Sequence, residues 1–181
     1  MLAVVAPSSA GAQFARRYVA FSVGATHSDL SDYLFNLGWR WGGTAGVHVG
    51  VVSFDYANLE LAPAWIRAGG GDIRLDYADV PVMLGAMLAV GRDVYVRPYG
   101  GLSLAVRFGC GGGQTQACDV ARRTTWSVPS GLSVIKVLES GDLVGIDARY
   151  VLGLSNVFTV TDATQRSWQL RILFGRALGD R

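Results

Sequence analysis

Residues 144–154, VGIDARYVLGL, alternate strictly between two kinds of side chain. Ile146 and Tyr150 fall on one side, and Asp147 and Arg149 fall on the other. A period of two indicates a β-strand with two different faces. In a soluble barrel the apolar face would point to the core. In a membrane barrel the apolar face meets lipid, and the charged residues point into the barrel.

Composition limits the classes of protein to which the chain can belong. It has 181 residues, of which 50% are apolar and 17% are charged, and 24 are glycine. It is long enough for one domain with a sizeable core. No apolar run approaches the roughly 18 residues that a transmembrane helix needs, so a helical membrane protein is excluded. The net charge of +2, with scattered basic residues, gives no indication of a nucleic-acid partner.

Eight segments alternate in this way and are expected to be strands. They are residues 17–26, 39–54, 59–67, 73–90, 94–108, 124–137, 143–156 and 167–178. The fourth also contains good helix formers at 83–88, so a short helix is the alternative there.

The connections between these segments differ systematically in length. Four are expected to be longer loops, at residues 27–38, 68–72, 109–123 and 157–166, with the second of them the least extended. Three are short turns, at residues 55–58, 91–93 and 139–142. In an up-and-down meander the loops gather at one end, as in outer-membrane barrels with extracellular loops and short periplasmic turns.

The two faces of the segments differ in the same sense throughout. One face carries large apolar side chains, and the other carries Gly, Ser, Tyr, Arg and Asp. If the apolar faces pointed inward, the surface would be unusually poor in charge for a soluble protein. Eight strands enclose an interior that side chains just fill. We therefore predict an all-β, eight-stranded antiparallel up-and-down transmembrane β-barrel in the bacterial outer membrane, with both termini periplasmic. A soluble lipocalin-like binding barrel is the alternative.

The charged residues that are expected to face inward are the main candidates for a polar site. By parity the predicted lumen charge network comprises Arg40, Glu60, Arg97, Arg107, Asp147, Arg149 and Arg171, with His48 as a further partner. A buried charge without a partner costs several kcal/mol, so these groups must pair or meet water. We interpret them as a structural network that fills the barrel and leaves no wide pore. A basic lumen that recognises an anionic group is the alternative.

Tryptophans and cysteines predict features of the loop end. Trp39, Trp41, Trp65, Trp126 and Trp168 all lie beside long loops and on the apolar face, which predicts an aromatic girdle at the bilayer interface. Cys110 and Cys118 lie in a glycine-rich segment and are expected to form a disulfide in an exported protein. No His or Cys cluster indicates a metal site, and no cofactor is expected.

The N-terminus resembles the end of a secretory signal peptide. Residues 10–12, AGA, form a small-x-small cleavage site after an apolar patch. We expect residues 1–12 to be the remnant of a signal peptide and residues 13–181 to be the barrel domain.

A parity change in the fourth segment predicts a bulge. The apolar residues are odd-numbered up to Tyr77 and even-numbered from Val80. A slip of one residue turns every side chain to the other face. We therefore expect a β-bulge at residues 78–80, beside Pro81.

Four stretches together resemble the PorT-like outer-membrane β-barrel family. They are LDYADVPVMLGAML from Leu75, VRPYGGLSLAV, GIDARYVLGLSNV and RSWQLRILFG. The resemblance implies an outer-membrane location. It implies no single activity, because some members are linked to secretion or gliding machinery and most are uncharacterised.

We expect a structural or interaction role rather than catalysis. The expected contacts are outer-membrane lipid and an envelope or extracellular protein that meets the loops. The alternative is a lipid-modifying enzyme, which would need a nucleophile, a base and an orienting acid. The candidate base is His27, in a segment with Ser28 and Asp29.

Overall fold

The strands of the protein are long, and they are joined by backbone pairing around a closed ring. A computed structural model describes residues 17–31, 38–53, 56–112, 116–160 and 162–178. Within these ranges the only helix is α1 (Gln116–Val120), and none is long and apolar enough to cross a membrane. The strands are β1 (Arg17–Ser31), β2 (Arg40–Ser53), β3 (Ala57–Leu61), β4 (Ala64–Gly70), β5 (Ile73–Ala86), β6 (Leu88–Ala89), β7 (Val94–Gly111), β8 (Thr124–Val137), β9 (Asp142–Gly153) and β10 (Thr164–Leu178).

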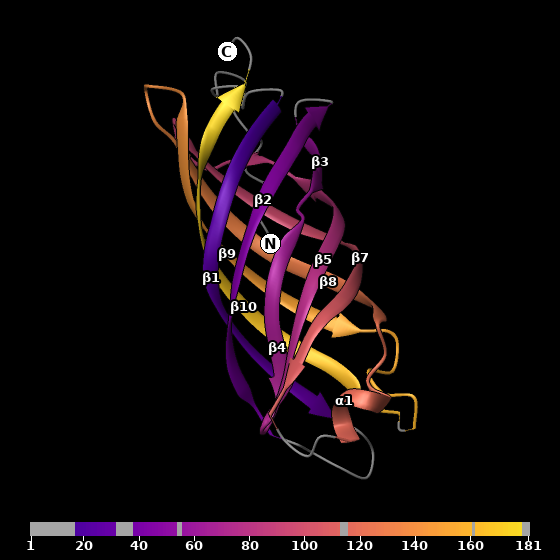
Figure 1. Cartoon of the computed structure of the whole chain (residues 1–181). Helices are drawn as coiled ribbons and strands as arrows, with labels where there is room; N and C mark the ends of the chain where they lie inside the picture. Colours follow the sequence, from indigo (N-terminus) through magenta and orange to yellow (C-terminus); the bar gives the residue numbers. More distant parts are fainter. Residues whose placement is uncertain (1–16, 32–37, 54–55, 113–115, 161, 179–181) are drawn as a thin grey trace, which may run out of the picture.

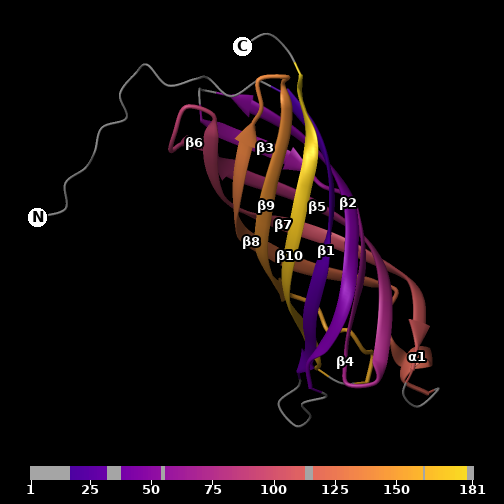
Figure 2. The same ribbon diagram turned by 90° about the vertical axis from the view of Figure 1, so that its left-hand side faces the viewer.

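Strand β1 pairs with β2 on one side and with β10 on the other. The first and last strands of the chain are therefore joined, and the sheet closes on itself. The ring continues through β9, β8, β7 and β5 to β3 and β4, which return to β2. Because β3 and β4 are two parts of one barrel strand, and β6 extends β5, the described ring has eight antiparallel strands (Figures 1 and 2). The predicted fold class is confirmed. The expected signal-peptide remnant at residues 1–12 lies outside the described residues.

Proline explains the interruption between β3 and β4. Pro63 has no N–H to donate, but its carbonyl accepts from Val47 N at 2.9 Å. Ala62 N donates to the carbonyl of Pro81 at 3.1 Å. These two bonds continue the ladder across the break, so one strand spans both parts.

Side chains alternate around the ring between an apolar exterior and a polar interior. Phe21 and Leu84 are 64% and 67% exposed, whereas Arg149 and Asp147 are 0% exposed. The large exposed side chains are overwhelmingly apolar. A soluble barrel would have the opposite arrangement, so the lipocalin-like alternative is wrong.

Turns and loops lie at opposite ends of the barrel, as expected. Arg17 pairs with Leu178 at the turn end, and α1 lies at the loop end (Figures 1 and 2). The expected loop at residues 68–72 is in fact a tight turn, because β4 continues to Gly70 and β5 begins at Ile73. Gly71 adopts φ 52°, a left-handed conformation that glycine tolerates best.

The predicted bulge at residues 78–80 is wrong. Strand β5 pairs without interruption there, and its odd-numbered residues face inward along its length. Leu75 and Tyr77 point inward because the lumen is apolar near the loop end, not because the strand slips. A bulge does lie nearby, on β7: Asp76 pairs with Gly109 and Tyr77 with Arg107, so Phe108 is the extra residue.

The lumen is filled in three layers. An apolar layer at the turn end includes Tyr18, Met87 and Ile135. A second apolar layer at the loop end includes Leu75 and Phe158. Buried charged side chains occupy the middle.

The exterior assignment predicts how charge is tolerated on the lipid-facing side. Ile172→Arg places a guanidinium near the middle of the apolar belt and should destabilise the barrel by about 2–4 kcal/mol. Leu154→Arg, at the loop end, should cost only about 0–1 kcal/mol. Urea unfolding in phospholipid vesicles measures both. Equal costs for the two variants would contradict the outward assignment.

Candidate functional site

The carboxylate of Glu60, on β3, is the first of two anionic centres in the lumen. It pairs with both terminal nitrogens of Arg97 on β7, in one case at 3.2 Å between Nη2 and Oε1. Tyr18 donates its hydroxyl hydrogen to the same carboxylate. His48 Nδ1 lies 2.9 Å from Glu60 Oε1, and His48 Nε2 lies 2.9 Å from the hydroxyl oxygen of Ser22. Side chains from three other strands, β1, β2 and β7, therefore converge on this one acid.

Asp147, on β9, is the second centre. Arg171 donates to its Oδ2 from Nε at 3.0 Å and from Nη2 at 2.5 Å. Tyr99 and Ser133 each donate a hydroxyl hydrogen to its Oδ1 at 2.7 Å. Arg149 Nε lies 3.9 Å from Oδ2. Each oxygen of this carboxylate therefore accepts two hydrogen bonds.

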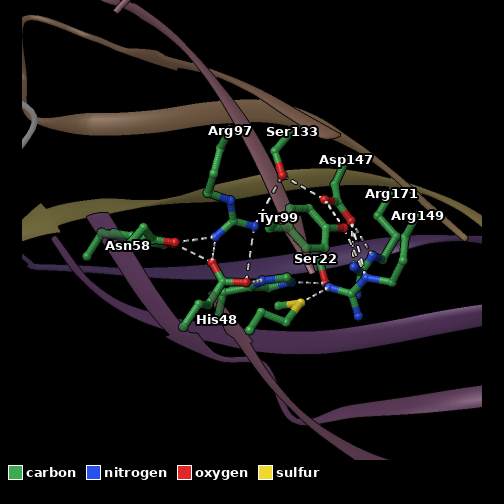
Figure 3. A network of polar contacts seen from close by, with 12 residues as sticks. Ser22, His48, Asn58, Arg97, Tyr99, Ser133, Asp147, Arg149 and Arg171 are labelled. Atoms are coloured by element: carbon green, nitrogen blue, oxygen red, sulfur yellow. Dashed lines mark hydrogen bonds and ion pairs between the residues drawn. The ribbon is translucent and has the colours of Figure 1, made fainter. Parts of the chain in front are cut away.

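Ser133 and Tyr99 connect the two centres. Ser133 accepts from Arg97 Nη2 at 3.1 Å while it donates to Asp147, and Figure 3 shows it between the two. The Tyr99 ring lies under the guanidinium carbons of Arg97 and Arg149, at 4.8 and 5.4 Å from its centroid. Such cation–π contacts are favourable where water is excluded. The charge network, defined as Glu60, Arg97, Asp147, Arg149 and Arg171, is continuous.

Glycines provide the space that the two tyrosines occupy. A Cβ at Gly50 would lie 2.1 Å from Cζ of Tyr18, and a Cβ at Gly131 would lie 2.6 Å from the hydroxyl oxygen of Tyr99. Any larger residue at either position would displace a tyrosine from its carboxylate. This accounts for part of the high glycine content of the inward face.

A third buried acid lies beside the charge network. Asp79 accepts a hydrogen bond from Ser103 and lies close enough to Arg149 and Arg171 to interact with them electrostatically. With Asp79 included, three carboxyl groups and three guanidinium groups lie in the middle of the described lumen. Each guanidinium group therefore has an acidic group near it within the barrel.

Two arginines assigned to this network by parity lie outside it. Arg40 donates from Nη1 to the carbonyl of Gly71 at 2.9 Å. Arg107 donates to the carbonyls of Cys118 and Ala121, at 3.1 and 2.8 Å. Both lie near the loop end, where backbone carbonyls rather than carboxylates are within reach. The inclusion of Arg40 and Arg107 in a single network is therefore corrected.

Segments from two loops pack together over the loop end and form a cap. We define the cap as residues 116–123 and 154–163, excluding 161. Arg122 N donates to Val157 O at 2.7 Å, and Thr159 N donates to Val120 O at 2.9 Å. Cys110 and Cys118 are joined by a disulfide, which attaches α1 to β7. Phe158 and Val157 bury their side chains in the apolar layer below.

The five tryptophans all point away from the lumen. Their exposed fractions range from 36% for Trp65 to 70% for Trp41. Each lies in the loop-end half of its barrel strand or beside it. His27 stacks on Trp39 and Trp41, with ring centroids 4.7 and 4.5 Å apart. The imidazole of His27 is thus part of the exterior aromatic surface.

Several residues of the site were not identified from the sequence. Tyr18, Tyr99 and Ser133 face inward at alternating positions, and parity could have indicated this. Their specific partners lie on strands 14 to 48 residues away in the chain, and no local pattern encodes such pairings. Among the described residues, no group of three or more His, Cys, Asp or Glu could hold a metal ion.

The pairing of Glu60 with Arg97 yields a stability prediction. Glu60→Gln leaves a buried guanidinium without its main counter-ion and should destabilise the barrel by about 3–5 kcal/mol. The double variant Glu60→Leu/Arg97→Met should recover most of that loss, since no unpaired charge remains. Glu139→Gln, at an exposed turn, is the matched control and should change stability by less than about 0.5 kcal/mol. Urea unfolding followed by tryptophan fluorescence compares the variants. A single variant as stable as the control would show that the pair is not structural.

Comparison with known proteins shows the fold. No protein-family model matches the chain, and no curated protein sequence matches it. Neisserial surface protein A is 17% identical with a TM-score of 0.62, covering 90% of this chain and 97% of that one. OprG of Pseudomonas aeruginosa is 11% identical with a TM-score of 0.60, covering 93% and 98%. AlkL, solved in lipid bilayers, is 12% identical with a TM-score of 0.56, covering 99% of both chains. The chain therefore has the fold of small outer-membrane β-barrels, and its apolar exterior is the surface by which such a barrel spans the bacterial outer membrane.

Proposed function

We propose that this protein is a non-enzymatic outer-membrane barrel of the PorT-like type, which acts by structure or by interactions through its extracellular loops. The observation that carries the proposal is the filled lumen beneath a disulfide-tethered cap. The family assignment rests on the four sequence stretches that start at Leu75.

The filling of the lumen argues against solute passage. Apolar layers occupy both ends of the described lumen, and the charge network occupies its middle. A cavity of about 30 Å³ lies near the loop end, lined in part by Tyr77, Asp79 and Gln169. That volume holds about two water molecules and no larger solute.

The cap supports a role in interaction. Its inner side chains are buried, but Arg122, Asp119 and Asp162 are exposed on it and Val160 is 69% exposed. The disulfide and the hydrogen bonds between the two loops give this surface a defined shape. A defined surface can recognise a partner at a lower entropic cost than a flexible loop can.

Strand geometry argues against a hydrolase that uses His27 as its base. His27 and Ser28 are consecutive residues of β1, so their side chains point to opposite faces. Ser28 directs its hydroxyl to Gly69 O at 2.9 Å, whereas His27 stacks among tryptophans outside. A nucleophile and its base must lie within hydrogen-bond reach, and these two do not.

A filled lumen predicts the absence of measurable transport. Vesicles that contain the purified full-length barrel should take up arabinose no faster than protein-free vesicles, because no water-filled path crosses the charge network. Vesicles with an open porin provide the positive control in the same swelling assay. Reproducible uptake above the protein-free rate would overturn the proposal of a closed barrel.

A role for the cap predicts which substitutions abolish binding. The full-length barrel, used as bait on native envelopes with chemical cross-linking, should recover an envelope or extracellular protein. Arg122→Glu/Val160→Asp should reduce that recovery about tenfold, as expected when central contacts are lost. Arg92→Glu, at an exposed turn of the opposite end, is the control and should recover the protein fully. A partner retained by the cap variant, or lost only in the control, would contradict a role for the loops.

A further inference from the structure

A cluster of two arginines and one aspartate lies on the outer face of the barrel, away from the lumen. Arg67 on β4 is directly opposite Asp76 on β5, and its Nε donates to Asp76 Oδ1 at 2.8 Å. Arg74 Nε lies 3.5 Å from Asp76 Oδ2. Trp65 Nε1 donates to Asp76 Oδ1 at 3.3 Å. We call Arg67, Asp76 and Arg74 the arginine clamp.

The direction of these side chains follows from the strand. Leu75 and Tyr77 are buried in the lumen, so the intervening Asp76 and its neighbour Arg74 face outward. Arg67 lies over the Trp65 ring, with its guanidinium carbon 5.2 Å from the ring centroid. Trp65 belongs to the exterior tryptophans that mark the interface. Arg67 is two residues beyond it, which is roughly 7 Å nearer the loop end.

Asp76 holds the guanidinium groups of Arg67 and Arg74 in place but cannot neutralise both of them. Asp76 contacts the Nε atoms of both arginines, and no hydrogen bond within the described residues engages their Nη atoms. The side chains of Arg67 and Arg74 are 40% and 43% exposed, whereas that of Asp76 is 9% exposed. Two guanidinium groups share one carboxylate, so one positive charge remains at the surface.

Neighbouring glycines supply space beside the clamp. Gly109 pairs with Asp76 across β7, and a Cβ there would lie 3.0 Å from Asp76 Cβ. A Cβ at Gly111 would lie 3.1 Å from Arg74 Nη2. Gly109 also lines an open hollow of about 410 Å³, to which the exposed Arg123 contributes.

We propose that the arginine clamp binds the phosphate group of an outer-leaflet lipid. Guanidinium groups bind phosphate oxygens through paired N–H donors, and Asp76 orients them for this geometry. The neighbouring exterior tryptophan Trp65 indicates that the clamp lies at headgroup depth, and the hollow that Gly109 lines begins at the residue paired with Asp76. The three clamp residues lie outside the cap, and Arg123 is the one cap residue that lines the hollow.

The test measures lipid retention on the full-length barrel in a neutral detergent by native mass spectrometry. Phosphatidic acid is the probe, and phosphatidylcholine is the lipid without an exposed phosphomonoester. Wild type should bind phosphatidic acid in preference to phosphatidylcholine. Arg67→Gln/Arg74→Gln should weaken the binding of phosphatidic acid about tenfold. Arg176→Gln, an exposed arginine at the turn end, is the matched control and should bind as wild type does.

A second variant tests orientation against simple charge. Asp76→Asn increases the net positive charge of the site, because it replaces the carboxylate that attracts both arginines with a neutral amide whose NH2 group faces a guanidinium. The clamp predicts weaker retention of phosphatidic acid, whereas attraction by charge alone predicts tighter retention. Heat-dependent gel migration verifies that each variant forms the folded barrel.

The proposal would be overturned by unchanged affinity in the double arginine variant, by tighter binding by Asp76→Asn, or by equal retention of both lipids by wild type. Inorganic phosphate distinguishes the source of the ligand. Its failure to displace phosphatidic acid at millimolar concentration supports a lipid site. Complete displacement would assign the clamp to soluble phosphate and refute the lipid assignment.

Discussion

Hydrocarbon offers no hydrogen-bond partner to a peptide group, and the rest of this structure depends on that constraint. Closure of β1 on β10 satisfies the backbone along the full length of both strands. Closure also sends alternate side chains into a lumen that eight strands make too narrow for bulk water. Polar residues on that inner face must therefore satisfy one another. The charge network follows from barrel closure as directly as the apolar exterior does.

Within the lumen, the charge network includes links between strands that the backbone ladder does not join. Glu60 on β3 receives donors from β1 and β7, neither of which pairs with β3. Asp147 on β9 receives donors from its ladder partners β8 and β10, and also from β7, which does not pair with β9. Buried ion pairs contribute little net stability when compared with apolar packing. Their consequence here is geometric, because each carboxylate accepts donors from a particular set of strands. The apolar layers above and below exclude water and so strengthen these pairs.

The two ends of the barrel carry different chemistry, and both proposals concern the loop end. There the cap covers the lumen, the five tryptophans point outward, and the arginine clamp lies beside Trp65. The turn end has short connections and an apolar layer of side chains. The cap is thus the folded surface at the loop end of the barrel. The arginine clamp is a cationic site on its lipid-facing side. The three clamp residues lie on β4 and β5, outside the cap, and the hollow beside Gly109 reaches the cap at Arg123.

The alternating pattern by itself determined the strands, their faces and the class of barrel, because a period of two is local and lipid reverses the usual polarity. It also placed Asp147, Arg149 and Arg171 in the lumen. The pattern failed near the loop end of the barrel, where polarity does not distinguish the two faces of a strand. Leu75 and Tyr77 are apolar yet point inward, because the lumen near the cap is itself apolar. Only the tertiary structure decided which inward arginines meet carboxylates and which meet loop carbonyls. Those distances depend on strand register and loop packing, and they join residues far apart in the chain.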